Sequence, residues 1–516
     1  MATPFLLQSS AVILAWSIAA YVSCLVLYRG WLSPLARIPG PKLAALTSWY
    51  ECYYDVVLPA QYVFKVKEMH AKYGPIVRIA PNDVSISDPD FVDTIYAPGA
   101  GHRRDKDHDK NKALGVDSSV GGSIAHELHR KRREALNPFF SPQQISRLDP
   151  QLNAKAAQLE ALLANAKKDG EVLNLSDIYF AFSNDVVHQY CFGDKLNLLA
   201  DLQLANIRRT NVAAVLGSVK VMLHFGWIRD VTQALPRYIG ARMTPPGVVD
   251  MITFREGIRT QIERILGRKP SPDETTSIFT HLRDSPHLPP SEKSAQRLED
   301  EATLMTMAGT YSPMLSLVTA HYHLLASPVI MAKLRDELSA HPYATTAAQL
   351  EQLPYLSAIT LEAHRLTFGL TGRNPRVCPD EAIVYTHEVG KDDFRTYRIP
   401  PGTSISTSTL LVHTDESLFP EPWKFKPERW LVTDQAVLAR QRRSMLGFMR
   451  GPRTCIGMHL ANAEMAILVA VMARWNMRLY ETNLDDVEFL HDYHVICPKL
   501  GSKGVRAEVL GHHVDL

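Results

Sequence analysis

The first apolar run of the chain is long enough to cross a membrane. No charged residue occurs from Pro4 to Tyr28, and Ala11 to Tyr28 is almost wholly apolar and free of glycine and proline. A helix of about 20 apolar residues spans the hydrocarbon core of a bilayer. Basic residues begin only at Arg29, so the positive-inside rule places the rest of the chain in the cytosol. A cleaved signal peptide would carry basic residues before the run, so we expect residues 1–30 to be a single-pass N-terminal anchor.

The pattern of the remaining chain predicts a mostly α fold with a small β region. Apolar positions at helical spacing predict a helix over 60–73, several helices within 143–268, and long helices over 291–326 and 457–477. These segments make up most of the chain, so the core is expected to be helical.

Alternating apolar and polar positions around turns predict the β region. A hairpin is expected over 76–86, short strands over 396–412 and a second hairpin over 489–509. Polar, glycine-rich and proline-rich segments at 98–123 and 269–291 are expected to be loops.

Prolines mark the joint between the anchor and the rest. Residues 31–42 contain Ile38-Pro39-Gly40-Pro41, and proline fixes its own φ and restricts its predecessor. We expect a stiff hinge over 31–42 and a single catalytic domain over 43–516.

Composition excludes several classes of protein. Fifty-six basic against 54 acidic residues give a net charge of +2, which gives no sign of a nucleic-acid partner. The six cysteines are far apart with no Cys-x-x-Cys pair, so neither a disulfide framework nor a zinc site is expected. Such usage fits a reducing compartment.

The stretch with the richest chemistry is residues 448–457, Phe-Met-Arg-Gly-Pro-Arg-Thr-Cys-Ile-Gly. Gly451 allows the backbone to approach a bound group closely. Cys455 stands just before a predicted helix, where backbone N–H groups favour a thiolate. A thiolate suits the axial position of a heme iron, and Arg453 suits a heme propionate.

The pattern Phe-x-x-Gly-x-Arg-x-Cys-x-Gly is filled at every fixed position and resembles the heme-thiolate loop of the cytochrome P450 family. The matching residues are Phe448, Gly451, Arg453, Cys455 and Gly457. The resemblance implies the cytochrome P450 fold and a heme b cofactor with Cys455 as the axial thiolate. It also implies that Phe448, Arg453 and Gly457 contact the cofactor, and that the turn of the tail hairpin projects into the substrate pocket.

Two further motifs of the family have counterparts. Glu362-x-x-Arg365 and the Arg429 of Pro-Glu-Arg-Trp resemble the family's buried ion network, which implies structural support for the cysteine loop. Removing one partner of such a network strands a buried charge and costs about 3–5 kcal/mol.

The resemblance also suggests partners for the heme propionates. Counting back from Pro138 places His129 and Arg133 where the family carries a Trp-x-x-x-Arg motif. The spacing after the Glu-x-x-Arg motif implies Arg376 as a further partner, with Arg373 as the alternative. His-x-x-x-Arg, together with Asn-Pro-Phe-Phe-Ser at 137–141, is similar to fungal secondary-metabolism members of the trichodiene oxygenase type.

The centre of the helix expected over 291–326 departs from the family's oxygen-binding motif, Ala/Gly-Gly-x-Asp/Glu-Thr. Ala308 and Gly309 match and would leave a flat surface against the heme, but Tyr311 takes the place of the acid and Ser312 that of the alcohol. We expect Ser312 to relay protons, with Thr310 as the second candidate. Pro313 cannot donate to the Gly309 carbonyl, so the helix is expected to kink.

The implied reaction is oxidation of an apolar terpenoid or polyketide intermediate with O2 and NADPH-derived electrons. No Gly-x-Gly-x-x-Gly fingerprint is present, so NADPH-cytochrome P450 reductase, with cytochrome b5 as a second donor, is the expected partner. A basic surface including Lys424 and Arg450 is a candidate docking site. The expected location is the endoplasmic reticulum membrane. An isomerase or dehydratase working without O2 and a non-enzymatic heme sensor stay open as alternatives.

Overall fold

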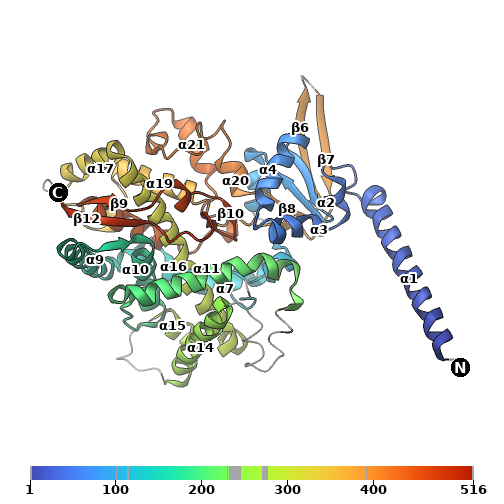
Figure 1. Cartoon of the computed structure of the whole chain (residues 1–516), viewed down its shortest axis with the longest axis horizontal. Coiled ribbons are helices and arrows are strands. Elements are labelled where there is room, and N and C mark those ends of the chain that lie inside the picture. The colour runs from blue at the N-terminus through green and yellow to red at the C-terminus, as the bar shows by residue number, and fades with distance from the viewer. Residues whose placement is uncertain are drawn as a thin grey trace.

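The computed structural model describes residues 3–99, 101–112, 115–228, 231, 246–269, 277–390 and 393–513. Helix α1 (Thr3–Leu27) stands away from the body of the molecule, and the hairpin of β6 (Ile383–Gly390) and β7 (Asp393–Ile399) projects from the same end (Figure 1). The segment Val12–Leu32 is long and apolar enough to cross a membrane, with a mean hydropathy of 1.7.

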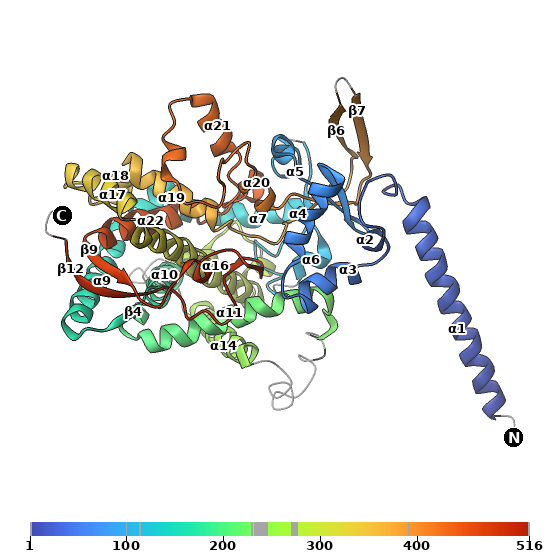
Figure 2. The same ribbon diagram turned by 45° about the horizontal axis from the view of Figure 1, so that its top comes forward.

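Helices form most of the body (Figures 1 and 2). Their remaining bounds are α2 (Lys42–Leu46), α3 (Trp49–Cys52), α4 (Tyr62–Tyr73), α5 (Val92–Tyr96), α6 (His108–Lys112), α7 (His126–Leu136), α8 (Pro142–Ser146), α9 (Asp149–Asp169), α10 (Leu175–Phe192), α11 (Leu202–His224), α14 (Pro246–Gly267), α15 (Ile278–Asp284), α16 (Ala295–Ala326), α17 (Pro328–Ala340), α18 (Ala347–Leu350), α19 (Pro354–Leu366), α20 (Thr409–His413), α21 (Gln435–Arg443) and α22 (Met458–Ala473).

The strands form four small sheets among the described residues. Their remaining bounds are β1 (Ile76–Ala80), β2 (Asp83–Ile86), β3 (Asp105–Lys106), β4 (Val172–Asn174), β5 (Arg376–Val377), β8 (Ser404–Ser406), β9 (Trp475–Leu479), β10 (His491–Asp492), β11 (Ile496–Cys497) and β12 (Arg506–His512). The largest sheet has the order β1-β2-β8-β5-β3, and a second has the order β4-β12-β9. In the largest sheet β2 and β8 run parallel, while the other neighbours are antiparallel.

The main core is formed where α9, α10, α16 and α22 pack together, with Leu159, Phe182, Leu317 and Leu468 fully buried. Helix α16 begins at a serine cap, because the Ser294 side chain accepts from a backbone N–H of the first turn. Its long apolar surface allows it to pack on both α10 and α22. The helix therefore runs through the centre of the molecule, next to the loop that precedes α22.

A glycine sets the distance between α10 and α16. A Cβ at Gly309 would lie 2.8 Å from the Val187 Cγ2 atom, closer than packed atoms approach. Gly309 therefore allows α10 and α16 to pack closely. The sequence predicted a different role for it, a flat surface against the heme. Helix α16 continues through Pro313 to Ala326.

Several expected elements differ from those observed. The helix expected over 457–477 ends at Ala473, because residues 475–479 pair with β12 as β9. The loop expected over 98–123 contains β3 and α6. In the loop expected over 269–291, residues 270–276 lie outside the described residues and 278–284 form α15, which a capping box at Ser277 starts.

Candidate active site

A cavity of about 310 Å³ lies between α16 and the loop that precedes α22. Cys455 lines this cavity, and so do Phe448, Arg453 and Gly457. We call it the thiol cavity. It brings together the residues of the cysteine loop that the sequence marks as cofactor contacts.

The loop is held in a tight conformation. The Cys455 N–H donates to the Phe448 carbonyl over 2.8 Å. Gly451 has a φ of +70°, and a Cβ there would lie 2.1 Å from the Tyr96 carbonyl oxygen. Only glycine fits at this position, because any side chain would clash with the backbone near Tyr96. The loop thus presents Cys455 to the cavity in a fixed position.

The ionisation of Cys455 reflects opposing effects. Burial raises the pKa of its thiol, while the backbone N–H of Gly457 and the guanidinium of Arg133 lower it. Burial prevails in the heme-free chain, but the N–H of Gly457 favours the thiolate, as the position before a helix predicts. A coordinated metal ion would deprotonate the thiol outright.

Positive side chains surround the thiol cavity. Among the described residues, none of them forms a salt bridge with an acid. We call the lysine and the arginines the thiol-cavity cations: Lys106, Arg133, Arg376 and Arg453, with the imidazole of His129 beside them.

Burial and the neighbouring positive side chains lower the pKa values of several of these residues. Burial and the guanidinium of Arg376 lower the pKa of Arg453 to about 9, and its Nε atom has no hydrogen-bond partner. Burial, with Arg453 and Arg133 nearby, lowers the pKa of His129 to about 3. Burial also holds the pKa of Lys106 well below its usual value. Each group is thus short of negative charge.

The acids in the same wall do not supply that charge. Glu301 is already paired with Arg297. The carboxyl of Glu464 accepts from Ser183 over 2.5 Å, and burial raises its pKa to about 8, so it is mostly protonated at neutral pH. Two carboxylates from a bound cofactor would neutralise the thiol-cavity cations, and the propionates of heme are such a pair. The residues present therefore fit heme.

The structure distinguishes the two arginines that the sequence left as alternatives. Arg376 lines the thiol cavity, where its guanidinium donates to the carbonyls of Asn374 and Pro375. Arg373 does not line it, and forms ion pairs with Glu51 and Asp83. Arg376 is therefore the better placed for a propionate.

Sequence analysis missed Lys106. Its Nζ donates to the Gly121 carbonyl and, over 3.1 Å, to Asn111 Oδ1. It lies in the segment 98–123, which the sequence predicts to be a loop. Nothing in the sequence of a polar segment distinguishes a buried lysine from an exposed one. Only the antiparallel pairing of β3 with β5 places it beside Arg376.

The ion network beneath the loop is formed as the motifs predict. Arg365 binds Glu362 through two hydrogen bonds of 2.9 and 2.8 Å, and Arg429 adds a third of 3.0 Å. Trp430 Nε1 also donates to Glu362 over 3.0 Å. Burial raises the pKa of Glu362, but the two arginines outweigh it and the pKa is lowered. This carboxylate is therefore charged and fully partnered.

A histidine that sequence analysis missed connects this network to the cysteine loop. His413 Nδ1 donates to the Arg365 carbonyl over 2.8 Å, and His413 Nε2 accepts from the Leu446 N–H over 2.9 Å. One ring nitrogen donates and the other accepts, so the ring is neutral. Burial lowers its pKa to about 3, in agreement with that geometry. His413 transmits the position of α19 to the segment just before Phe448.

A family model described as Cytochrome P450 matches residues 52–492. The chain belongs to the cytochrome P450 family. Members are oxidoreductases that bind heme through a cysteine thiolate. The expected family, fold class, enzyme class and cofactor are thereby confirmed.

Characterised relatives span nearly the whole chain. The P450 is 35% identical over 509 residues to Cytochrome P450 monooxygenase tpcC of Cochliobolus heterostrophus, covering 95% of each chain. It is 34% identical over 491 residues to Conidiogenone synthase PchP450 of Penicillium rubens, covering 95% of this chain and 97% of the relative. It is 32% identical over 487 residues to Cytochrome P450 monooxygenase TRI4 of Trichoderma arundinaceum, covering 93% and 92%. The likeness to fungal members is confirmed.

Helix α16 of the P450 contains the four candidate oxygen-site residues. Three of them face the thiol cavity, and one faces α10. Ala308, Gly309 and Ser312 line the thiol cavity. Thr310 is buried outside it, and its hydroxyl accepts from Asn184 Nδ2 over 3.1 Å. That bond fixes Thr310 against α10, so its position does not fit a proton relay. Ser312 remains the predicted relay.

A second cavity of about 260 Å³, here the outer cavity, adjoins the first. Leu304, Ala308 and Ser312 line both. Tyr311 lines only the outer cavity. The side chain that replaces the family's acid thus faces the outer cavity, away from the wall that contains Cys455.

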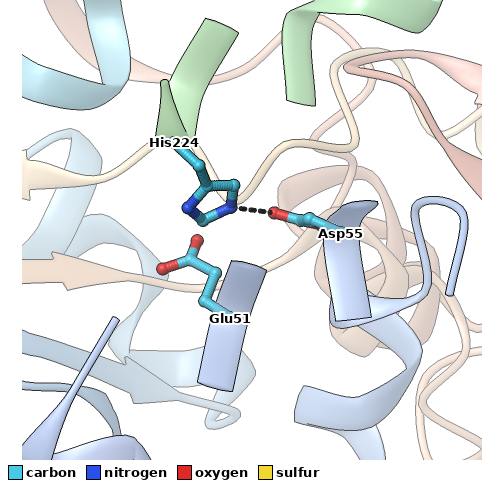
Figure 3. Close-up of side chains that lie close together, drawn as sticks. All are labelled: Glu51, Asp55 and His224. Carbon is cyan, nitrogen blue, oxygen red and sulfur yellow. Dashed lines mark hydrogen bonds and ion pairs between the residues drawn. The ribbon is translucent and has the colours of Figure 1, made fainter. Parts of the chain in front are cut away.

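Buried ion pairs tie together the N-terminal segment, α11 and the tail beside the outer cavity. His224 Nε2 lies 3.2 Å from Asp55, with Glu51 alongside (Figure 3). Acids alternate with bases, so each carboxylate of this group already has a partner within the protein. We call this group the outer ion network: Glu51, Asp55, Asp83, Asp492, Lys110, Lys220, Arg373 and His224.

Proposed function

We propose that this P450 is a monooxygenase of an apolar secondary-metabolite intermediate, a terpenoid or a polyketide. The observation that carries the proposal is the thiol cavity, in which Cys455 faces a group of unneutralised cations. Heme b bound there supplies the activation of dioxygen, with electrons derived from NADPH. The chain's own residues hold the cofactor, exclude water and position the proton donor.

Each residue has a defined part in this proposal. Cys455 would ligate the iron, with Phe448 and Gly457 in the same loop. His129, Arg133, Arg376 and Arg453, together with Lys106, would hold the propionates. Ser312 Oγ holds a proton at the wall shared by the two cavities. Ala308 and Gly309 leave room above the heme.

The substrate class follows from the lining of the cavities and from the relatives. Most of the outer cavity wall is apolar, including Val212, Leu216, Val219 and Leu223 on α11. The similar proteins named above are fungal P450 proteins. An apolar substrate reaches such an enzyme readily if residues 1–30 anchor it, through the hinge at 31–42, to the endoplasmic reticulum membrane.

Family members use external redox partners, and we propose NADPH-cytochrome P450 reductase, assisted by cytochrome b5. The candidate docking surface is only partly free. Lys424 and Lys426 pair with Glu421, and Arg450 pairs with Asp93. Arg442 and Arg443 at the end of α21 are the better candidates for contacts with an acidic partner.

The test is the spectrum of the reduced, carbon monoxide-treated protein. Thiolate ligation gives a Soret band at long wavelength, and Cys455→Ala should abolish it. Cys191→Ala replaces another buried cysteine away from both cavities and should retain the band. A long-wavelength band that survives Cys455→Ala would overturn the proposal.

Tyr311 at the position of the family's acid favours one alternative, an isomerase or dehydratase that works without O2. Product formation by the purified protein without reductase would select it. Full dependence on reductase, NADPH and O2 would select the monooxygenase.

A further inference from the structure

The outer cavity has a largely apolar wall in which two polar side chains besides Ser312 form no hydrogen bond to the described residues. Tyr311 on α16 and His494 in the turn between β10 and β11 both line it. Neither side chain lines the thiol cavity. A substrate whose reacting carbon faces Cys455 would therefore meet these two groups with its remote end.

The Tyr311 hydroxyl is available to a ligand. The Tyr311 hydroxyl forms no hydrogen bond to any of the described residues. Burial, with Cys497 nearby, raises its pKa to about 12, so it is a neutral phenol at physiological pH. A neutral phenol both donates and accepts one hydrogen bond.

His494 is held in the wall by a backbone conformation that costs free energy. Its φ is +73°, a region that residues with a side chain seldom adopt. The Thr371 N–H donates to the His494 carbonyl over 2.9 Å, and the His494 N–H donates to Asp492 over 3.1 Å. A non-glycine residue kept in such a conformation is a candidate for function.

The imidazole of His494 also has no partner for its ring nitrogens among the described residues. A Cβ at Gly372 would lie 3.1 Å from His494 Nδ1, so the absence of a side chain there gives the ring its room. Burial lowers its pKa to about 4. The neutral ring offers one donor and one acceptor.

The cations in the same wall are already engaged. Lys106 and Arg376 line the outer cavity where it meets the thiol cavity, and the proposed function assigns them to the heme propionates. Lys110, Lys220 and Arg373 also line it, and each is paired with acids of the outer ion network. A carboxylate on the substrate would compete with those acids. A neutral oxygen on the substrate would not compete with those acids. It would form hydrogen bonds with Tyr311 and His494, which otherwise stay unpaired in a mostly apolar wall.

Resting on the proposed monooxygenase function, we propose that Tyr311 and His494 form a subsite for a hydroxyl or carbonyl group that the substrate already carries. The two residues determine specificity by holding that oxygen at the end of the substrate remote from Cys455. The preceding reaction must then be one that leaves an oxygen on the skeleton, such as an earlier oxygenation or a cyclisation ended by water.

The test uses the heme-loaded enzyme and a panel of terpene hydrocarbons, each paired with an alcohol of the same skeleton, such as cedrane with cedrol. Binding is followed by the change in the Soret band. We expect the better alcohols to bind about tenfold more tightly than their hydrocarbons, since a net hydrogen bond contributes about that much. Tyr311→Phe and His494→Phe should each remove most of that preference and leave hydrocarbon binding unchanged.

Tyr179→Phe is the matched control. Tyr179 is fully buried, its hydroxyl also has no partner, and it stacks on His321 away from both cavities. It should bind both members of every pair as the wild type does. If no alcohol binds more tightly than its hydrocarbon, or Tyr311→Phe weakens both members equally, the subsite is wrong. In that case the long-wavelength Soret band and reductase-dependent turnover would still support the monooxygenase.

Discussion

The outer ion network and the thiol-cavity cations both place several positive side chains in the walls of the joined cavities. In the network, each permanent cation has a carboxylate partner: Lys220 lies 2.8 Å from Asp492 and 3.2 Å from Asp55. Around Cys455, the cations face one another, and those with shifted pKa values are all shifted toward the neutral form.

This difference indicates what each group is for. A buried charge is tolerated when it is paired within the protein. The network meets that condition, so its role is to tie the segment around Glu51, the end of α11 and the tail together. The thiol-cavity cations do not meet it, so their missing partner must come from outside the chain. The comparison thus identifies a cofactor site from charge alone.

Arg373 and Arg376 lie three residues apart and test this comparison directly. The larger loss is expected for Arg373, which belongs to the outer ion network. Arg373→Met removes the guanidinium shared by the buried acids Glu51 and Asp83 and leaves the two carboxylates with Lys110 between them. Removing one partner of a buried pair costs about 3–5 kcal/mol. The free energy of unfolding, measured by urea denaturation of the heme-loaded enzyme, should fall by that amount.

The double variant Glu51→Gln/Arg373→Met should regain part of the loss, because one of the two carboxylates left with Lys110 is gone. The folded fraction of either variant should still bind heme as tightly as the wild type. Weakened heme binding with unchanged stability would place Arg373 among the cofactor residues and would invalidate the division.

Arg376→Met should have the opposite profile. Arg376 has no acid partner, and burial lowers the pKa of its guanidinium. Removing it costs the heme-free protein little, but removes a charge-assisted bond to a propionate, worth about 1.5–3 kcal/mol. Heme dissociation, followed by transfer to a heme-scavenging protein, should accelerate about tenfold to a hundredfold. An unchanged rate would exclude Arg376 as a propionate partner.

The sequence predicted the parts of the site that depend on short-range pattern. The loop around Cys455 and the Glu362, Arg365 and Arg429 network follow from fixed spacings. The hairpin expected over 489–509 is shorter in the structure, because β10 pairs with β11 while β12 pairs with β4 and β9. Its turn, which contains His494, does line the outer cavity.

The sequence could not reveal features created by distant contacts. Lys106 reaches the cofactor site only because β3 pairs with β5, and His413 acquires its role only because α19 packs against the loop before Phe448. Thr310 was misplaced for a related reason. Two residues along a helix rotate a side chain by about 200°, so Thr310 faces α10 when Ser312 faces the cavity.

The smallest expected effect is a pH dependence carried by Lys106. Burial, with Arg376 and Arg453 nearby, holds its pKa below the ordinary value in the folded heme-free chain. Between the two pKa values the unfolded chain binds the extra proton, so stability rises with pH until the unfolded lysine titrates near pH 10.5. One proton corresponds to at most about 1.4 kcal/mol per pH unit.

Urea denaturation of the heme-free protein at increasing pH, kept below the pKa of the unfolded lysine, should therefore show a rising free energy of unfolding. Lys106→Met should remove this contribution. Lys220→Met, in the outer ion network, should lower stability yet keep the slope, because acids raise the pKa of Lys220 rather than lower it. With heme bound, the propionates supply the charge that Lys106 lacks, so the slope should disappear; a slope that persists in the heme-loaded enzyme would show that Lys106 stays unneutralised.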